Sequence, residues 1–266
     1  MDTSAGSEVR SAARKAGDHP AVEWGARLGY AASGLIHLLI AYVALRVAWQ
    51  GSGGTADQTG ALAQLRQAPG GGLVLWLCVV GFALLAVWQL SETVTGGLGG
   101  ETGDRVKAAA KCVIYLALAW TALKFASGGS SSSKQQTKDF TATLLQHSGG
   151  RILVVLIGLG IVAVGGYHVY KGWKKKFLED LRENPGTWAV NAGRVGYIAK
   201  GVAFVVLGGL FVFAGVQKAA SKATGLDGAL RTLRDAPLGT LLLTVVALGI
   251  AAYGIYSFAR AKAARV

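Results

Sequence analysis

The chain has 266 residues, of which 52% are hydrophobic and only 15% are charged, and its mean hydropathy is +0.42. A soluble domain carries roughly 25% charged residues. Lys and Arg outnumber Asp and Glu by 27 to 14, which gives a net charge of +13. Because the hydrophobic residues are gathered in long runs, this composition is typical of a membrane protein. It fits poorly with a soluble enzyme, a disulfide-rich secreted protein or a nucleic-acid-binding protein.

Six apolar runs of about 20 residues are each long enough to cross a hydrocarbon core ~30 Å thick. The first run follows a polar segment and lacks a small-residue cleavage site, so we expect no removable signal peptide and a tail at 1–23. An even number of spans places both termini on one side of the membrane. The predicted spans are 28–49, 72–92, 106–126, 150–171, 192–215 and 238–259.

The positive charges are divided unequally between the two sides. Seven Lys and Arg residues lie on the side away from the termini: Arg66, Lys134, Lys138, Lys218, Lys222, Arg231 and Arg234. Fifteen lie on the side of the termini: Arg10, Arg14, Lys15, Arg27, Arg105, Lys107, Lys171, Lys174, Lys175, Lys176, Arg182, Arg194, Arg260, Lys262 and Arg265. Since Lys and Arg gather in cytoplasmic loops, this distribution predicts a plasma-membrane protein with both termini in the cytoplasm.

The sequence repeats itself three times, over 24–103, 104–187 and 188–266. The segment at 26–45 aligns without a gap with 193–212, and 104–123 matches both more weakly. The connecting segments also agree, since GALAQLRQAP at 60–69 resembles GALRTLRDAP at 228–237, and we align TATLLQHSGG at 141–150 with them. Each repeat therefore predicts a helix, a loop with a short helix, and a second helix.

The predicted fold is an all-α integral membrane protein. Because each repeat contains two spans, the three repeats share one orientation, and we expect six transmembrane helices as three parallel two-helix repeats in a pseudo-threefold arrangement about the membrane normal. Glycines recur in the second helix of each repeat, where small residues let helices approach closely. The short segments 57–68 and 225–236 are expected to lie flat on the outer interface, with Arg66 and Arg234 on lipid phosphates.

This order of elements resembles a bacterial family known as domain of unknown function 1206. The resemblance rests on the pattern R-x-G-Y-x-A-x-G at 27–34 and 194–201 and on the L-R-x-A-P turns at 65–69 and 233–237. The middle repeat departs from it, with Lys107 and Ala108 where the others have Gly and Tyr. The resemblance implies a six-helix membrane protein of three repeats, and it implies no activity or catalytic residue.

Polar residues inside the spans are the candidates for a site, because burying them in hydrocarbon is costly. In the repeat alignment, Ser33, Lys111 and Lys200 occupy equivalent positions, and Gln89, His168 and Ser257 form a second equivalent triplet. Both triplets lie roughly 5–10 Å below the cytoplasmic interface. Glu92, Lys171 and Arg260 follow the second triplet, three residues closer to the cytoplasm. Glu92 is the only acid expected nearby.

The triplets predict a shallow, positively charged vestibule facing the cytoplasm, in which Lys111 and Lys200 bind an anionic lipid headgroup or a small anion. In the alternative, both lysines snorkel to the interface. The protein would then be a scaffold that docks membrane partners through Lys174, Lys175 and Lys176. The expected partners are therefore anionic membrane lipids or another membrane protein. We expect a non-enzymatic protein without a cofactor, and no nucleic acid as partner.

The remaining reactive residues give weak signals for chemistry. Ser33 and His168 at similar depth could form the pair of an intramembrane serine hydrolase, which is the remote alternative. His37 is expected to bond a neighbouring backbone carbonyl rather than a haem. Cys78 and Cys112 lie at different depths, so we expect two buried free thiols. No spacing of His, Cys, Asp or Glu within a span predicts a metal site.

Overall fold

The protein is entirely helical apart from one isolated bridge, as far as the described residues show. The computed structural model describes residues 11–12, 15, 19–51, 54–96 and 102–264. Arg10, Arg14 and Arg265 of the charge count, and most of the predicted tail 1–23, lie outside these residues.

Within the described residues, six helices are long and apolar enough to cross a membrane. Each helix extends beyond its predicted span by two to eight residues at the end nearer the termini. Helix α2 begins eight residues early, where His19 accepts from the Ala21 N–H and Pro20 stands in the first turn. The six helices are α2 (Pro20–Gln50), α4 (Gly71–Thr95), α5 (Thr102–Ala126), α7 (Gly150–Trp173), α8 (Thr187–Gln217) and α10 (Gly239–Ala263).

Shorter helices connect these six. A short helix precedes the second long helix of each repeat, namely α3 (Gln58–Gln67), α6 (Ser133–Gln146) and α9 (Gly225–Arg234), and two 3₁₀ helices are η1 (Lys176–Asp180) and η2 (Ala220–Lys222). Gly70, Gly149 and Leu238 take equivalent left-handed conformations before α4, α7 and α10. Our alignment of 141–150 with 60–69 is therefore wrong by two residues, because Gly150 corresponds to Gly71.

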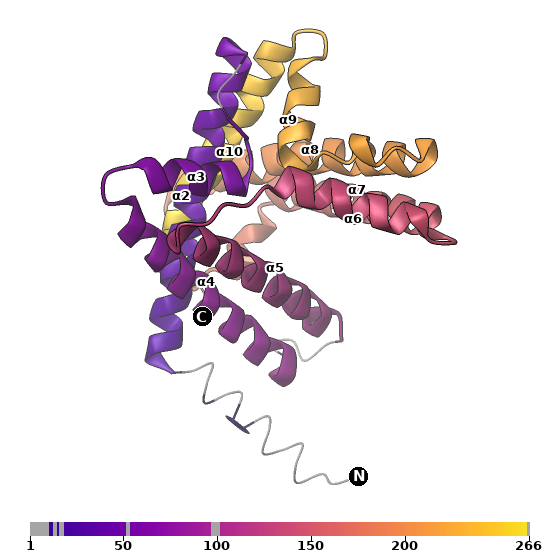
Figure 1. Ribbon diagram of the computed structural model, residues 1–266. Coiled ribbons are helices and arrows are strands. Elements are labelled where there is room, and N and C mark those ends of the chain that lie inside the picture. The colour runs from indigo at the N-terminus through magenta and orange to yellow at the C-terminus, as the bar shows by residue number, and fades with distance from the viewer. Residues whose placement is uncertain (1–10, 13–14, 16–18, 52–53, 97–101, 265–266) are drawn as a thin grey trace, which may run out of the picture.

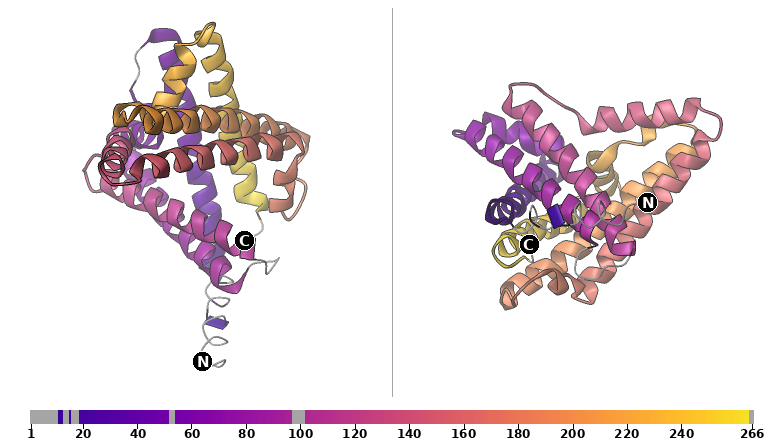
Figure 2. Two further views of the ribbon diagram at one scale, coloured as in Figure 1. Left: turned by 90° about the vertical axis from the view of Figure 1, so that its right-hand side faces the viewer. Right: turned by 90° about the horizontal axis from the view of Figure 1, so that it is seen from below.

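The closest helix packing joins successive repeats rather than the two helices of one repeat. Helix α4 packs on α5, α7 on α8, and α10 on α2, which closes the chain on itself. Figure 1 shows these three pairs running in different directions, with α2 and α10 upright, and the further views are given in Figure 2. The first turns of α2 lie beside the last turn of α10, since Arg27 donates to the carbonyl of Lys262.

Small residues mark an equivalent crossing point in each of these pairs. A Cβ on Gly34 of α2 would lie 2.9 Å from the Gly254 oxygen of α10, and one on Gly201 of α8 would lie 2.6 Å from the Gly165 oxygen of α7. At the α4–α5 crossing, Cys112 donates to the Ala86 oxygen over 3.4 Å. Cys78 and Cys112 are both buried and free, as predicted.

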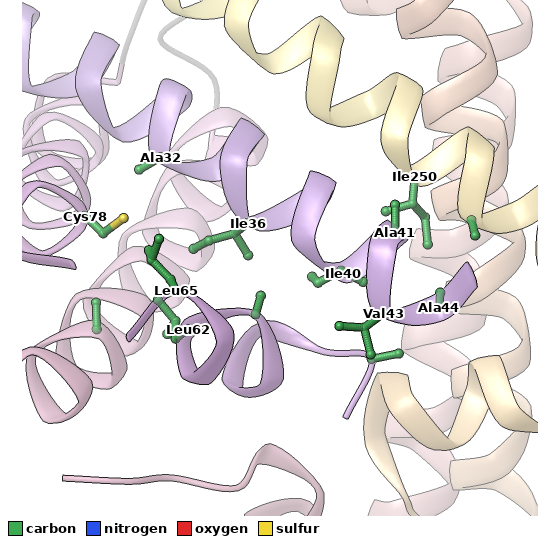
Figure 3. Close-up of a cluster of buried hydrophobic side chains, with 14 of the residues drawn as sticks. Ala32, Ile36, Ile40, Ala41, Val43, Ala44, Leu62, Leu65, Cys78 and Ile250 are labelled. Atoms are coloured by element: carbon green, nitrogen blue, oxygen red, sulfur yellow. The ribbon is translucent and has the colours of Figure 1, made fainter. Parts of the chain in front are cut away.

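The main core lies where α2 meets α3, α4 and α10 (Figure 3). Ile36 and Ile40 of α2 are fully buried, and Leu62 and Leu65 of α3 enter the same core. Our expectation that α3 and α9 lie flat on the interface is corrected here, because their leucines are covered by protein and not by lipid. Arg66 and Arg234 donate to the Gly129 and Gly51 carbonyls.

A buried carboxylate ties the short helices together at the end away from the termini. Asp227 of α9 accepts from Arg231 at 3.0 Å, lies 3.6 Å from Lys134 of α6 and accepts from the Ala56 N–H before α3. Asp57 caps α3 by accepting from the Gly60 N–H over 3.0 Å. Burial raises the pKa of Asp57, and the neighbouring Asp227 charge adds to that rise.

Exposed tryptophans mark both ends of the long helices. Such side chains prefer the membrane–water interface, so their positions agree with spanning helices. Trp24, Trp173 and Trp188 lie near the end that carries the termini, and Trp49, Trp76 and Trp120 near the other end.

Candidate functional site

The predicted site residue with the clearest surroundings is Lys200 on α8. Its Nζ lies 4.2 Å from the ring centroid of Tyr253 and 5.7 Å from that of Phe204. The Tyr253 ring also lies 4.7 Å from the His37 ring and 5.2 Å from the Tyr197 ring. Lys200 is half-buried, so its charge is held against aromatic faces, which stabilise a cation through the negative side of the ring.

The two histidines and Ser33 form different contacts from those predicted for a serine hydrolase. Ser33 Oγ lies 3.4 Å from His37 Nδ1, whereas His168 packs on the rings of Tyr197 and Phe204. His37 bonds the Ser33 carbonyl over 2.7 Å, as expected for a histidine within a helix. His168 bonds the Val164 carbonyl over 2.8 Å in the same way.

Gln89 and Ser257 are both buried in helix packing. Ser257 donates to the Tyr253 carbonyl over 2.9 Å, one turn earlier on α10. Lys111 on α5 is exposed. The two triplets are thus split by their burial: Lys111, Lys200, Ser33 and His168 keep some accessible surface, and Gln89 and Ser257 do not.

A cluster of charges that sequence reasoning did not assemble centres on Asp180 in η1. Lys171 Nζ donates to Asp180 Oδ2 over 2.7 Å, and Arg260 Nη2 lies 3.8 Å from the same oxygen. Although partial burial favours the neutral acid, the charges of Arg260, Lys171 and Lys111 hold the pKa of Asp180 below its usual value. Our expectation that Glu92 is the only nearby acid is therefore wrong.

Packing of the loop between the second and third repeats places Asp180 there. Phe177 of η1 is fully buried, stacks on Tyr197 at 5.3 Å and meets the edge of Tyr256 at 5.1 Å. Tyr256 donates to the Phe177 carbonyl over 3.3 Å. After Asp180, the Arg182 N–H donates to the Ala263 carbonyl over 2.8 Å and pins the loop to the end of α10.

Two of the cations sit on tyrosines at equivalent repeat positions. Arg260 lies 4.3 Å from the ring centroid of Tyr30, and Lys171 lies 5.5 Å from that of Tyr197. In both pairs the cation ends the second helix of one repeat and the tyrosine belongs to the first helix of the next. The recurring Tyr of the R-x-G-Y pattern was the signal in the sequence that could have revealed these contacts.

The interface between the first and second repeats lacks this pair. Glu92 occupies the position of the cation there, and Ala108 that of the tyrosine. Together, Lys111, Lys171, Lys200 and Arg260 are called the cation cluster below. Four positive charges outnumber the carboxylates of Asp180 and Glu92 there, and the Arg260 Nε is buried without a hydrogen-bond partner. Such an arrangement suits an anion better than a metal ion, and the described residues contain no group of three potential metal ligands.

Long apolar helices in repeated pairs define a multi-pass α-helical membrane protein. The model of the family described as Domain of Unknown Function (DUF1206) matches residues 28–96, 106–175 and 195–264, so the chain belongs to this family in three repeats. This confirms the resemblance seen in the sequence.

The chain is also 29% identical over 246 residues to the "Uncharacterized protein YxxB" of Bacillus subtilis (strain 168), and the match covers 87% of each chain. No solved structure matches the chain.

Proposed function

We propose that this membrane protein binds an anionic group, either a lipid headgroup or a small anion, at the cation cluster, and that it does so without catalysis. The observation that carries the proposal is the excess of positive charge around Asp180. Lys171 and Arg260 share the Asp180 carboxylate, while the charge of the exposed Lys111 also acts on it and Lys200 rests on Tyr253. A bound phosphate or carboxylate would offset this excess through charge-assisted hydrogen bonds.

The proposal includes the topology and the symmetry of the molecule. We place both termini in the cytoplasm, because the Lys and Arg residues gather at that end. We also propose a pseudo-threefold arrangement of the repeats, which the equivalent crossing points at Gly34–Gly254, Gly201–Gly165 and Cys112–Ala86 support. A reporter that is active only outside the cytoplasm should give no signal when it is fused after Val266. A signal would reverse the orientation.

Retention of lipid during native mass spectrometry tests the binding site. Lys111→Gln combined with Lys200→Gln should remove anionic phospholipid adducts, because both substitutions keep a polar side chain of similar size and remove the charge. Lys218→Gln combined with Lys222→Gln is the matched control at the other end of the molecule and should leave the adducts unchanged. Unchanged adducts in the first variant would contradict the proposal.

The scaffold remains the rival explanation, and the same experiment separates it. Lys174 and Lys175 are exposed just after α7, and each basic residue near an anionic leaflet contributes about 1 kcal/mol of attraction. If the protein only attracts lipid through this patch, neutralising Lys174, Lys175 and Lys176 removes the adducts. If the cation cluster binds the lipid instead, this triple variant should retain the adducts.

A further inference from the structure

The two long helices of the middle repeat are separated from each other. Helix α2 packs on α4 in the first repeat and α8 packs on α10 in the third, but α5 and α7 make almost no contact. Figure 1 shows the α4–α5 and α7–α8 pairs diverging. The most apolar windows of α5 and α7 are accordingly 17% buried, against 39–50% in the other four long helices.

The separation has a cause in the sequence. A Cβ on Gly29 would lie 2.5 Å from the Gly81 oxygen, and one on Gly196 would lie 2.5 Å from the Tyr253 nitrogen, so both glycines are needed for helices of one repeat to touch. The middle repeat has Lys107 at this position. Its long side chain cannot fit such a contact, and it pairs instead with Asp104 at 3.0 Å on the surface.

Gly160 of α7 shows that the missing contact leaves open space. Its equivalents in the other repeats face the first helix of their own repeat: a Cβ on Gly81 would lie 2.8 Å from the Gly29 nitrogen, and one on Gly249 would lie 2.2 Å from the Ala199 Cβ. A Cβ on Gly160 would meet nothing within 4 Å. The side of α7 that should face α5 is therefore uncovered.

The cation cluster lies at one end of this opening. Lys111 is one helical turn beyond Lys107 on α5, and Lys171 ends α7 on the opposite side. Val164 and Gly160 share the face of α7 with Lys171 at helical spacing, and Val164 is exposed. The eleven steps from Gly160 to Lys171 span about 16 Å along the helix, close to the thickness of one leaflet.

We propose that an anionic phospholipid occupies this opening, with its phosphate at Lys111 and Lys171 and an acyl chain along Val164 and Gly160. The inference rests on the proposed function and narrows its ligand to a lipid, which reaches the cluster sideways between α5 and α7. A small anion would bind the charges and leave the apolar face of α7 at Val164 and Gly160 uncovered. A phospholipid matches both features, because its phosphate fits the positive charges and its acyl chain fits the apolar face.

The test fills the opening without touching the charges. Gly160→Trp should lower retention of phosphatidylglycerol in native mass spectrometry by about tenfold, the factor for losing contact with roughly two methylene groups. Gly166→Trp is the matched control, because Gly166 lies on the same helix and its Cβ would also meet nothing within 4 Å. It should retain phosphatidylglycerol as the unaltered protein does, and phosphatidylcholine should be retained weakly by all three proteins.

A second measurement separates failure of this inference from failure of the proposed function. Inorganic phosphate should raise the Tm of the Gly160→Trp protein as much as that of the unaltered protein, since the cluster is intact. If both tryptophan variants retain phosphatidylglycerol equally, the lateral opening is not its site and this inference is overturned. If the Lys111→Gln, Lys200→Gln protein responds to phosphate and to phosphatidylglycerol as the unaltered protein does, the proposed function itself is overturned.

Discussion

Lys171 Nζ and Asp180 Oδ2 are 2.7 Å apart, and this contact joins the end of α7 to the loop that follows it. Both side chains are partly covered, with 17% and 26% exposed, and Arg260 lies on the same carboxylate. Asp180→Asn would leave two neighbouring cations facing each other without a counter-charge. We expect a loss of about 1–3 kcal/mol in the free energy of unfolding, measured by thermal or denaturant unfolding in micelles.

Asp104→Asn is the control for this variant. Asp104 pairs with Lys107 at a similar distance, 3.0 Å, but the two side chains are 45% and 67% exposed. Exposed pairs contribute little, so the loss should stay below about 0.5 kcal/mol. Equal losses in the two variants would show that the Asp180 cluster has no special role in stability.

The loss of stability at low pH should depend on Asp180. Because the pKa of Asp180 is lower in the folded protein than in an unfolded chain, its contribution is complete above the ordinary carboxyl pKa and disappears as the pH falls through the lowered value. Tm measured from about pH 6 down to about pH 3 should therefore fall less steeply for Asp180→Asn than for the unaltered protein. Parallel curves would contradict the assignment.

Asp57 should have the opposite dependence on pH. Its pKa is raised by burial, so the folded state holds the proton more tightly and stability decreases as the pH rises from the ordinary carboxyl pKa through the raised value. Asp57→Asn keeps an oxygen for the Gly60 N–H and removes the buried charge. Its Tm at pH 7 should exceed that of the unaltered protein, whereas Asp57→Ala should lose about 1 kcal/mol with the helix cap.

An Asp57→Asn protein that keeps the full pH dependence would show that another group titrates there. The scan described for Asp180, extended up to about pH 7, provides this comparison.

The crossing of α7 and α8 should be sensitive to a single methyl group. Gly201→Ala places a Cβ 2.6 Å from the Gly165 oxygen, which forces the helices apart, so we expect a loss of about 1–3 kcal/mol. Gly209→Ala on the same helix meets nothing within 4 Å and should be neutral or slightly stabilising. Thermal unfolding of both variants in one detergent is the measurement. A loss in Gly209→Ala as large as in Gly201→Ala would show that the close crossing is not what makes Gly201 sensitive, because helix propensity alone favours Ala at both positions.

Local rules were enough to predict several features correctly from the sequence. In hydrocarbon every backbone N–H and C=O must be paired within its own segment, so a run of about 20 apolar residues becomes a helix whatever surrounds it. Six such helices follow from this reasoning. The short helices near 57–68 and 225–236 follow from the helical spacing of their leucines, and the unpaired thiols from the different depths of the two cysteines. The His37–Ser33 contact spans one helical turn and was predictable for the same reason.

The sequence by itself thus determined the helices, their repetition and the recurring glycines. Only the tertiary structure decided which helices pair and which charges meet. Asp180 lies in a loop without periodicity, and it reaches Arg260 because Phe177 is buried against Tyr197 and Tyr256 from two other helices. Lys107 was visible as a departure from the repeat, but its consequence required the missing contact between α5 and α7. Such contacts join residues far apart in the chain, and apolar helices offer lipid or protein nearly equivalent surroundings, so no pattern within one helix can fix its neighbour.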